Sequence, residues 1–219
     1  MFHIPPSVKA VLFDLNGTLI RDGAVHFSAF QEVLTEEGIA ITPEEFETKV
    51  ANSLNRLIWP TLLRRNLSET ELADLSARKE QRYLELLPSI GRPTEGIFAL
   101  LDALRSRNIQ TALVTTTPRY IAEKVLDLLE LSGEFEMRIC GEEVKKGKPD
   151  PEIYMLTLAK LGVTAETALA FEDSPKGVLS ARAAGIRVVG VLPEYPAELL
   201  IKNGAEQCVK DFTEVVLKY

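Results

Sequence analysis

Hydrophobic and polar positions alternate in two different ways along the chain, and these patterns divide it into three stretches. Residues 8–13 form a short apolar run that ends at Asp14-Leu15-Asn16-Gly17, which is typical of a buried strand followed by a turn. From about residue 20 to Pro88 the apolar positions follow helical spacing. After Gly91, strand-like and helix-like segments alternate. The pattern therefore predicts a helical block between two parts of an α/β unit.

Helix start and stop signals subdivide the helical block. Gly38 ends a first amphipathic segment, and Thr42 precedes a proline and two acidic residues, which is typical of a helix start. We expect Pro60 to interrupt that second helix. Ser68 and Glu71 have the spacing of a capping box and predict the start of a third helix.

The alternating part predicts a parallel sheet with helices on both faces. The first strand belongs to this sheet although the helical block separates it from the second strand. The predicted fold is α/β, a Rossmann-like parallel sheet core with an inserted all-α cap. The predicted domains are a core of residues 1–20 and 92–219 and a cap of residues 21–91. Beyond the first strand, we expect strands over residues 109–114, 137–140, 168–171, 187–191 and, at an edge, 207–209.

Composition and charge restrict the class of protein. The 219 residues carry a formal net charge of −7, which argues against a nucleic-acid or anionic-membrane surface. Cys140 and Cys208 fit no metal spacing, so we expect free thiols in a reducing compartment. No apolar run has membrane length, and the first residues lack the features of a signal peptide. These features predict a cytoplasmic protein, a monomer or weak homodimer.

Chemically active side chains follow the predicted strands. Asp14, Thr115, Glu172 and Asp173 stand at strand ends, and Lys148 precedes a helix. Because parallel strands end at one edge of a sheet, these groups can converge there. Three carboxylates around one point repel each other unless a cation lies between them, and oxygen ligands suit Mg²⁺. A lysine and a hydroxyl beside the metal suit a phosphoryl group, and Asp14 could attack phosphorus as a nucleophile.

Four segments carry a family resemblance, and they occur in the family's order. They are Phe13–Leu19, Leu113–Thr116, Gly147–Pro151, and Phe171–Ser174 with Gly177. Together they resemble the four motifs of the haloacid dehalogenase-like superfamily, in the branch of β-phosphoglucomutase and phosphoglycolate-phosphatase-type enzymes. The resemblance covers about residues 8–191.

The resemblance implies a role for each motif residue. Asp14 would become an aspartyl-phosphate, Thr115 would hold the phosphoryl group, and Lys148 would neutralise its charge. The resemblance also implies a Mg²⁺ cofactor and a cap that closes over the site. The implied metal ligands are Asp14, the backbone carbonyl of Asn16, Glu172 and Asp173.

The chain departs from the family pattern at Asn16. Phosphatases of the family carry a second aspartate there, which acts as general acid and base. An amide cannot exchange a proton near neutral pH, and loss of such a catalyst costs about 100- to 10,000-fold in rate. Asn16 is either native in a divergent member or a substitution, and both explanations stay open. Dehalogenases and phosphonoacetaldehyde hydrolases also lack this aspartate. However, Glu172-Asp173 does not match the former, and Leu54 stands where the latter carry a cap lysine.

A second set of residues is predicted to contact substrate. Each also has a simpler explanation, as part of a helix start or of a solvated helix face. His26 resembles a histidine that lies near the leaving group in β-phosphoglucomutase relatives, although a lone histidine is more often structural. The predicted substrate contacts are Thr116, Arg119, His26, Asn52, Ser53 and Arg56, with Thr117 as a further candidate.

The leading functional prediction is a Mg²⁺-dependent phosphatase acting on a small phosphorylated metabolite through Asp14. Two alternatives remain at this point. A β-phosphoglucomutase-like phosphosugar mutase would depend even more on the missing acid/base group. A catalytically silent member would bind a phosphorylated ligand without turnover.

Overall fold

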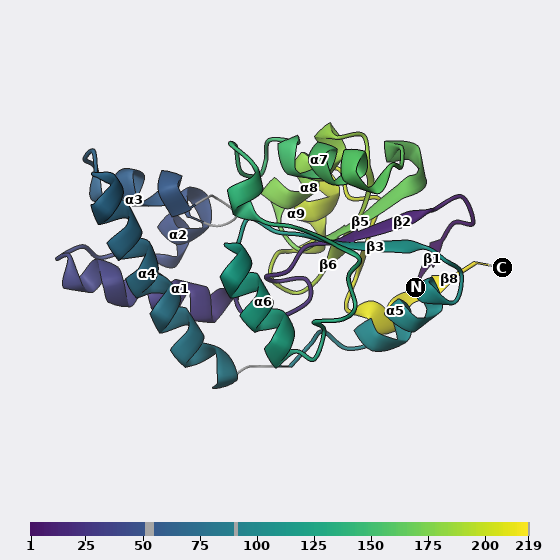
Figure 1. Cartoon of the computed structure of the whole chain (residues 1–219), viewed down its shortest axis with the longest axis horizontal. Coiled ribbons are helices and arrows are strands. Elements are labelled where there is room, and N and C mark those ends of the chain that lie inside the picture. Colours follow the sequence, from purple (N-terminus) through teal and green to yellow (C-terminus); the bar gives the residue numbers. More distant parts are fainter. Residues whose placement is uncertain (51–54, 90–91, 219) are drawn as a thin grey trace. The chain divides into compact units, whose positions relative to one another are not determined.

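The computed structural model describes residues 1–50, 55–89 and 92–218, and its chain divides into two compact units (Figure 1). The first unit comprises Met1–Arg21 and Arg92–Tyr219, and the second comprises Asp22–Gly91. The first is built of strands and helices, whereas the described part of the second is helical. The predicted fold class, a Rossmann-like core with an inserted helical cap, is confirmed. We call the two units the core and the cap.

Six strands of the core form one parallel sheet, with β2 in its interior (Figure 1). Such a sheet requires a crossover between successive strands, which explains the alternation of elements along the chain. In spatial order the strands are β4 (Met137–Ile139), β3 (Gln110–Val114), β2 (Ala10–Phe13), β5 (Ala168–Glu172), β6 (Arg187–Val191) and β7 (Gln207–Val209). The helices of the core are α5 (Ile97–Arg105), α6 (Arg119–Leu128), α7 (Glu152–Leu161), α8 (Pro175–Ala183) and α9 (Ala197–Lys202).

The central strands are buried on both faces. Every residue of β2 and β5 is buried, as expected for uninterrupted apolar runs in a parallel sheet. Phe13 stacks on Phe171 with ring centroids 5.4 Å apart, and Phe212 packs edge-on against both rings. Burial of such a ring contributes about 1.5–3 kcal/mol. Because Phe13 directly precedes Asp14, this packing also fixes where the Asp14 backbone leaves the sheet.

A second, two-stranded sheet joins the two ends of the chain. β1 (Phe2–Ile4) pairs in parallel with β8 (Val215–Leu217), near the N and C labels of Figure 1. The sequence pattern did not predict this sheet. β4 and β7 are equally short, but they belong to the alternating run of strands and helices, whereas β1 and β8 lie outside that run and have no such context.

The cap consists of α1 (Gly23–Glu36), α2 (Pro43–Lys49), α3 (Asn55–Leu63) and α4 (Glu69–Leu86) in its described residues. Thr42 and Ser68 form capping boxes with Glu45 and Glu71, so both predicted helix starts are confirmed. The apolar faces of these helices enclose a core of their own. Its buried members include Phe30, Val33, Leu34, Ile41, Phe46, Ile58, Trp59, Leu62 and Leu75.

The expectation that Pro60 interrupts a helix is wrong, because Pro60 lies inside α3. Proline removes one backbone donor from the helix. Burial of the neighbouring residues stabilises the helix against this loss: Ile58 and Trp59 are buried, and the indole Nε1 of Trp59 donates to Ser76 Oγ at 3.0 Å.

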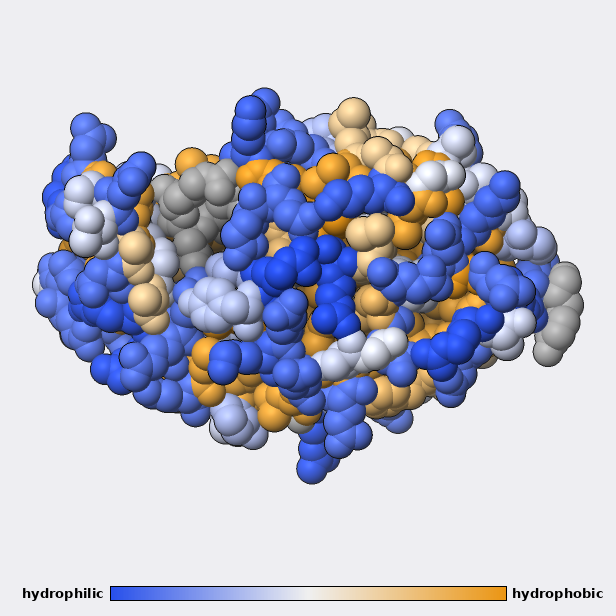
Figure 2. All heavy atoms as spheres, in the orientation of Figure 1, coloured by the Kyte–Doolittle hydropathy of each residue, from blue (hydrophilic) through white to orange (hydrophobic). Residues whose placement is uncertain are grey.

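Polar side chains cover much of the visible face of the molecule, with hydrophobic ones scattered among them (Figure 2). Across the described residues, no helix has both the length and the apolar character needed to cross a membrane.

Candidate active site

Strand register brings the predicted catalytic residues to one edge of the sheet. Phe13 lies opposite Leu113 on β3 and Phe171 on β5, so the residues that follow leave the sheet side by side. Asp14 follows β2, Thr115 follows β3, and Glu172 ends β5. All three side chains are buried. The structure therefore brings these three sequence-predicted residues together.

Lys148 lies between two of these carboxylates. Its Nζ is 2.6 Å from Asp14 Oδ1 and 2.5 Å from Glu172 Oε1, and it also donates to the backbone oxygen of Val114 at 3.2 Å. Three acceptors satisfy the three donors of the ammonium group. Burial alone would lower the pKa of Lys148, but the charges of Asp14 and Glu172 raise it above its usual value. Lys148 therefore carries its positive charge at neutral pH.

The loop that carries Lys148 is tied to the helix that follows. The carboxylate of Glu152, in the first turn of α7, accepts hydrogen bonds from the backbone N–H groups of Lys145 and Lys146 at 2.8–3.1 Å. An acidic side chain is favourable at a helix N-terminus, so this arrangement also stabilises α7. It fixes the loop from which Lys148 reaches the sheet edge.

Asp14, Glu172 and Asp173 form a buried cluster of carboxylates. Each offers one oxygen within 4.8 Å of the oxygens of the other two. Burial, partly offset by Lys148, raises the pKa of Glu172 to about 7. Burial and the charges of Asp14 and Glu172 raise the pKa of Asp173 well above its usual value. One lysine thus leaves the negative charge of this cluster incompletely compensated.

The cluster fits a divalent cation. Within the described residues, Glu172 Oε2 and Asp173 Oδ1 are buried without a hydrogen-bond partner. Buried polar atoms in native proteins normally have a partner, and a bound ion is one explanation for an exception. Clustered carboxylate oxygens are hard ligands of the kind that Mg²⁺ prefers. Glu172 and Asp173, with Asp14, would hold the ion.

Two glycines allow the backbone to approach the carboxylates. Gly17 has a φ of +79°, and a Cβ atom there would lie 2.1 Å from Asp173 Oδ2. A Cβ atom at Gly177, in α8, would lie 1.8 Å from Glu172 Oε2. Both distances are shorter than any contact between non-bonded atoms allows, so a side chain at either position would displace a carboxylate of the cluster.

Asn16 is linked to the turn after β3. Thr117 Oγ1 donates to Asn16 Oδ1 at 2.5 Å, and the Thr117 backbone N–H donates to Thr115 Oγ1 at 3.1 Å. A hydroxyl both accepts and donates, so the Thr115 O–H can still donate to a ligand. Thr116 lies half-buried in the same turn. The position predicted for acid/base catalysis is therefore held beside the position predicted to bind the phosphoryl group.

Arg119, a predicted substrate contact, pairs with protein groups instead. Its Nη2 is 2.5 Å from Glu143 Oε1 and 3.0 Å from the backbone oxygen of Arg138. Its backbone N–H donates to the carboxylate of Glu142. These contacts support a structural role at the start of α6.

His26, in α1, is partly buried and belongs to a polar group of the cap whose other members are buried. Its Nε2 is 3.3 Å from Asp22 Oδ2, its Nδ1 is 3.2 Å from Lys79 Nζ, and its ring stacks on Tyr83 at 4.2 Å. Burial, followed by the charge of Lys79, lowers the pKa of His26. We call Asp22, His26, Lys79 and Tyr83 the cap cluster. Of the other predicted cap contacts, Asn52 and Ser53 lie outside the described residues, as does the side chain of Arg56.

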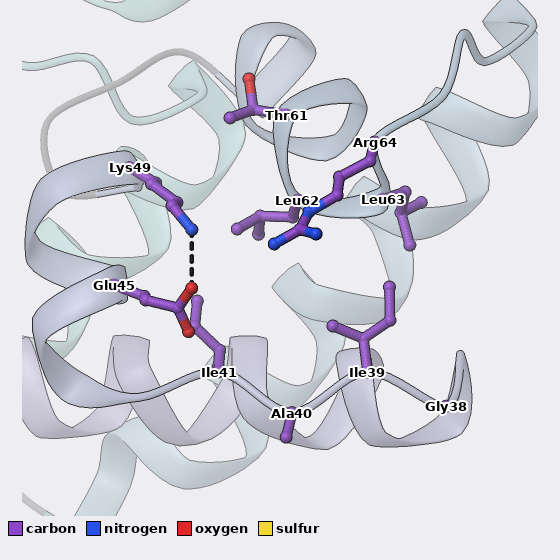
Figure 3. Close-up of a pocket in the computed structure, with 10 residues that line it drawn as sticks. All are labelled: Gly38, Ile39, Ala40, Ile41, Glu45, Lys49, Thr61, Leu62, Leu63 and Arg64. Carbon is purple, nitrogen blue, oxygen red and sulfur yellow. Dashed lines mark hydrogen bonds and ion pairs between the residues drawn. The ribbon is translucent and has the colours of Figure 1, made fainter.

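The cap also has a pocket of about 320 Å³ between α2 and α3 (Figure 3). Apolar side chains, including Ile39 and Ile41, line it, and the ion pair of Lys49 with Glu45 lies on one side. None of the predicted site residues that the structure describes is among those that line it.

Several buried polar residues were not singled out from the sequence, among them Tyr154, Lys79 and Tyr83. Tyr154, in α7, donates from its hydroxyl to Glu172 Oε1 at 2.5 Å. Lys79 and Tyr83 were missed in the cap. A usable signal existed for both, because Leu75, Lys79 and Tyr83 follow one another at intervals of four and so share one helix face.

A parallel α/β core with a carboxylate cluster and a buried lysine at its sheet edge, interrupted by a helical unit, defines a class of capped hydrolases. A family model described as haloacid dehalogenase-like hydrolase matches residues 8–185. The chain belongs to this family and is an enzyme. The resemblance of the four sequence motifs is thereby confirmed.

Known proteins resemble the chain over nearly its whole length. It is 32% identical over 205 residues to a phosphorylated carbohydrates phosphatase of Thermotoga maritima, covering 93% of this chain and 94% of that one. It is 34% identical over 201 residues to the protein CbbY of Rhodobacter capsulatus, covering 86% and 87%. A crystal structure of mutant CbbY from Rhodobacter sphaeroides with xylulose-(1,5)bisphosphate superimposes with a TM-score of 0.83 at 26% identity, covering 96% and 97%.

Proposed function

We propose that the protein is a Mg²⁺-dependent phosphomonoesterase that acts on a small phosphorylated metabolite through an aspartyl-phosphate on Asp14. The observation that carries the proposal is the Asp14–Lys148–Glu172 contact beside a carboxylate cluster that fits a cation. The names of the relatives support a phosphorylated carbohydrate as the first substrate class to test.

The residues of the site have complementary roles in this proposal. A carboxylate oxygen of Asp14 forms a bond to phosphorus while the bond from phosphorus to the substrate oxygen breaks. Lys148 stabilises the negative charge that develops on the phosphoryl oxygens, and the Thr115 hydroxyl donates to one of them. Bound Mg²⁺ would supply further charge compensation. Water then cleaves the aspartyl-phosphate, which releases phosphate and restores Asp14.

Asn16 limits both steps. Its amide cannot give a proton to the leaving oxygen, and it cannot take one from the attacking water. Substrates with good leaving groups, such as 4-nitrophenyl phosphate, therefore react best in the first step. Phosphoenzyme accumulates because its hydrolysis has no general base at position 16. Thr117 holds the Asn16 side chain by a hydrogen bond that a carboxylate could accept equally well.

Replacement of Asn16 by aspartate tests the proposal. Phosphate release from sugar phosphates should rise by about 100- to 10,000-fold in Asn16→Asp. It should vanish with a chelator and in Asn16→Asp combined with Asp14→Asn. The matched control is Asn108→Asp. Asn108 is exposed, and its left-handed backbone (φ +53°) suits aspartate as well as asparagine, so this variant should leave the rate unchanged.

Three outcomes would contradict the proposal. An unchanged rate in Asn16→Asp across a panel of phosphoesters would show that position 16 is not the acid/base position. A rise in melting temperature with Mg²⁺ and phosphate, without phosphate release by the parent protein or by Asn16→Asp, would instead indicate a phospholigand-binding member. Conversion of a hexose 1-phosphate to the 6-phosphate would identify a mutase.

A further inference from the structure

We propose that Tyr154 is a positioning residue for the metal site: its hydroxyl fixes the carboxylate of Glu172 so that Oε2 is left for the cation. This inference rests on the proposed function, because it assumes that the carboxylate cluster binds Mg²⁺. No sequence motif singled out Tyr154, and its position in an amphipathic helix is equally typical of a core residue.

The contacts of Tyr154 join two parts of the site. Its side chain is fully buried, and its hydroxyl donates to Glu172 Oε1 at 2.5 Å. The Nζ of Lys148 donates to the same oxygen and lies 5.4 Å from the centroid of the Tyr154 ring. Tyr154 therefore contacts both the lysine and the acid of the site.

Two donors on one oxygen make the two oxygens of Glu172 different. Oε1 accepts hydrogen bonds from the Tyr154 phenol and the Lys148 ammonium group, whereas Oε2 has no hydrogen-bond partner within the described residues. The absent side chain of Gly177 leaves room for Oε2. A tyrosine phenol is protonated near neutral pH, so Tyr154 is the donor in this hydrogen bond. Such outer hydrogen bonds orient metal ligands, and their loss typically weakens metal binding by 10- to 100-fold.

The chain connects Tyr154 to the lysine loop. Tyr154 lies in the first turn of α7, two residues after Glu152, whose carboxylate holds the backbone of that loop. Both donors of Glu172 Oε1 therefore come from one short stretch of chain, Lys148 and the first turn of α7.

The test is the affinity of the metal-free protein for Mg²⁺, measured by isothermal titration calorimetry and by thermal shift, with no substrate present. Tyr154→Phe removes one hydroxyl and should raise the Kd for Mg²⁺ by about 10- to 100-fold. The matched control is Tyr83→Phe. Tyr83 is also fully buried and donates to a buried carboxylate, Asp22, at 2.6 Å, but in the cap cluster. That variant should keep the parental Kd.

A double variant adds a second measurement. If Tyr154 acts through Glu172, Tyr154→Phe should cause no further loss of Mg²⁺ affinity in a Glu172→Gln background. An equal further loss in that background would overturn the inference. So would a parental Kd in Tyr154→Phe, whether or not its melting temperature falls. A parent protein that binds no Mg²⁺ would instead contradict the proposed function.

Discussion

The core and the cap each bury a lysine beside a tyrosine ring, and in each the tyrosine donates to a buried carboxylate. In the core, Lys148 Nζ lies 5.4 Å from the centroid of the Tyr154 ring, and the tyrosine donates to Glu172 at 2.5 Å. In the cap cluster, Lys79 Nζ lies 5.2 Å from the centroid of the Tyr83 ring, and the tyrosine donates to Asp22 at 2.6 Å. The same three types of side chain therefore meet twice in one chain.

The pKa values of the two lysines nevertheless shift in opposite directions. Burial disfavours the charged form of both. For Lys148 the two carboxylates in direct contact reverse this effect, and its pKa rises. For Lys79 burial dominates over the attraction of Glu80 and Asp22, and its pKa falls to about 8. Lys79 Nζ lies 3.2 Å from His26 Nδ1, which carries no negative charge to stabilise the ammonium group. The number of carboxylates in contact, rather than burial, decides the sign.

The largest expected effect is that of Lys148→Met. It leaves the carboxylates of Asp14 and Glu172 buried without their cation. Breaking a buried ion pair by removal of one partner costs about 3–5 kcal/mol. We expect the free energy of unfolding, measured with urea in the presence of a chelator, to fall by this amount. Phosphate release in the Asn16→Asp background should fall at least about 100-fold.

Mg²⁺ provides the control for this prediction. A divalent cation in the cluster would replace part of the lost positive charge, so saturating Mg²⁺ should restore part of the stability of Lys148→Met. A variant as stable as its parent without Mg²⁺ would show that Lys148 does not compensate the carboxylates.

Lys79→Met should raise the free energy of unfolding, whereas Lys148→Met lowers it. The reason is that Lys79→Met removes an ammonium group that burial disfavours. One unit of pKa corresponds to about 1.4 kcal/mol, so a fall from 10.5 to about 8 costs the native state about 3 kcal/mol. Below pH 8 Lys79 is protonated in both the native and the unfolded state, so the native state bears the whole cost. Between pH 8 and 10.5 the unfolded state binds more protons, so the stability of the parent rises with pH.

The gain in stability of Lys79→Met over its parent should therefore become smaller as the pH rises. We expect it to be about 3 kcal/mol more stable than its parent at pH 7 and about equal to it near pH 10.5, by urea denaturation at each pH. Lys79→Met also removes the charge that Asp22, Glu80 and His26 face, so the test is how the stability difference between the two proteins changes with pH. A constant advantage across this range would show that Lys79 is buried without a lowered pKa.

The difference between strand ends and helix faces explains which of these residues the sequence could predict. Asp14, Thr115 and Glu172 follow or end apolar runs, and the shared edge of a parallel sheet brings them together whatever their partners are. Lys79 and Tyr154 lie within helices, where the sequence shows a helix face but not the group opposite it. A lysine there is normally solvated, and a tyrosine normally belongs to the core. The contacts of Arg119 with Glu143 were hidden for the same reason.

Arg119→Gln provides the exposed reference for the two buried lysines and has the smallest expected effect. The ion pair of Arg119 with Glu143 is as short as that of Lys148 with Glu172, at 2.5 Å, but 42% of the Arg119 side chain is exposed. Solvent screens such a pair, which is typically worth about 0–1 kcal/mol. We expect a loss of at most about 1 kcal/mol by urea denaturation. Because the guanidinium is already paired, the KM for sugar phosphates in the Asn16→Asp background should stay within about threefold, which is less than 1 kcal/mol. A tenfold rise in KM without a loss of stability would instead assign Arg119 to the substrate, as its place after the second motif first predicted.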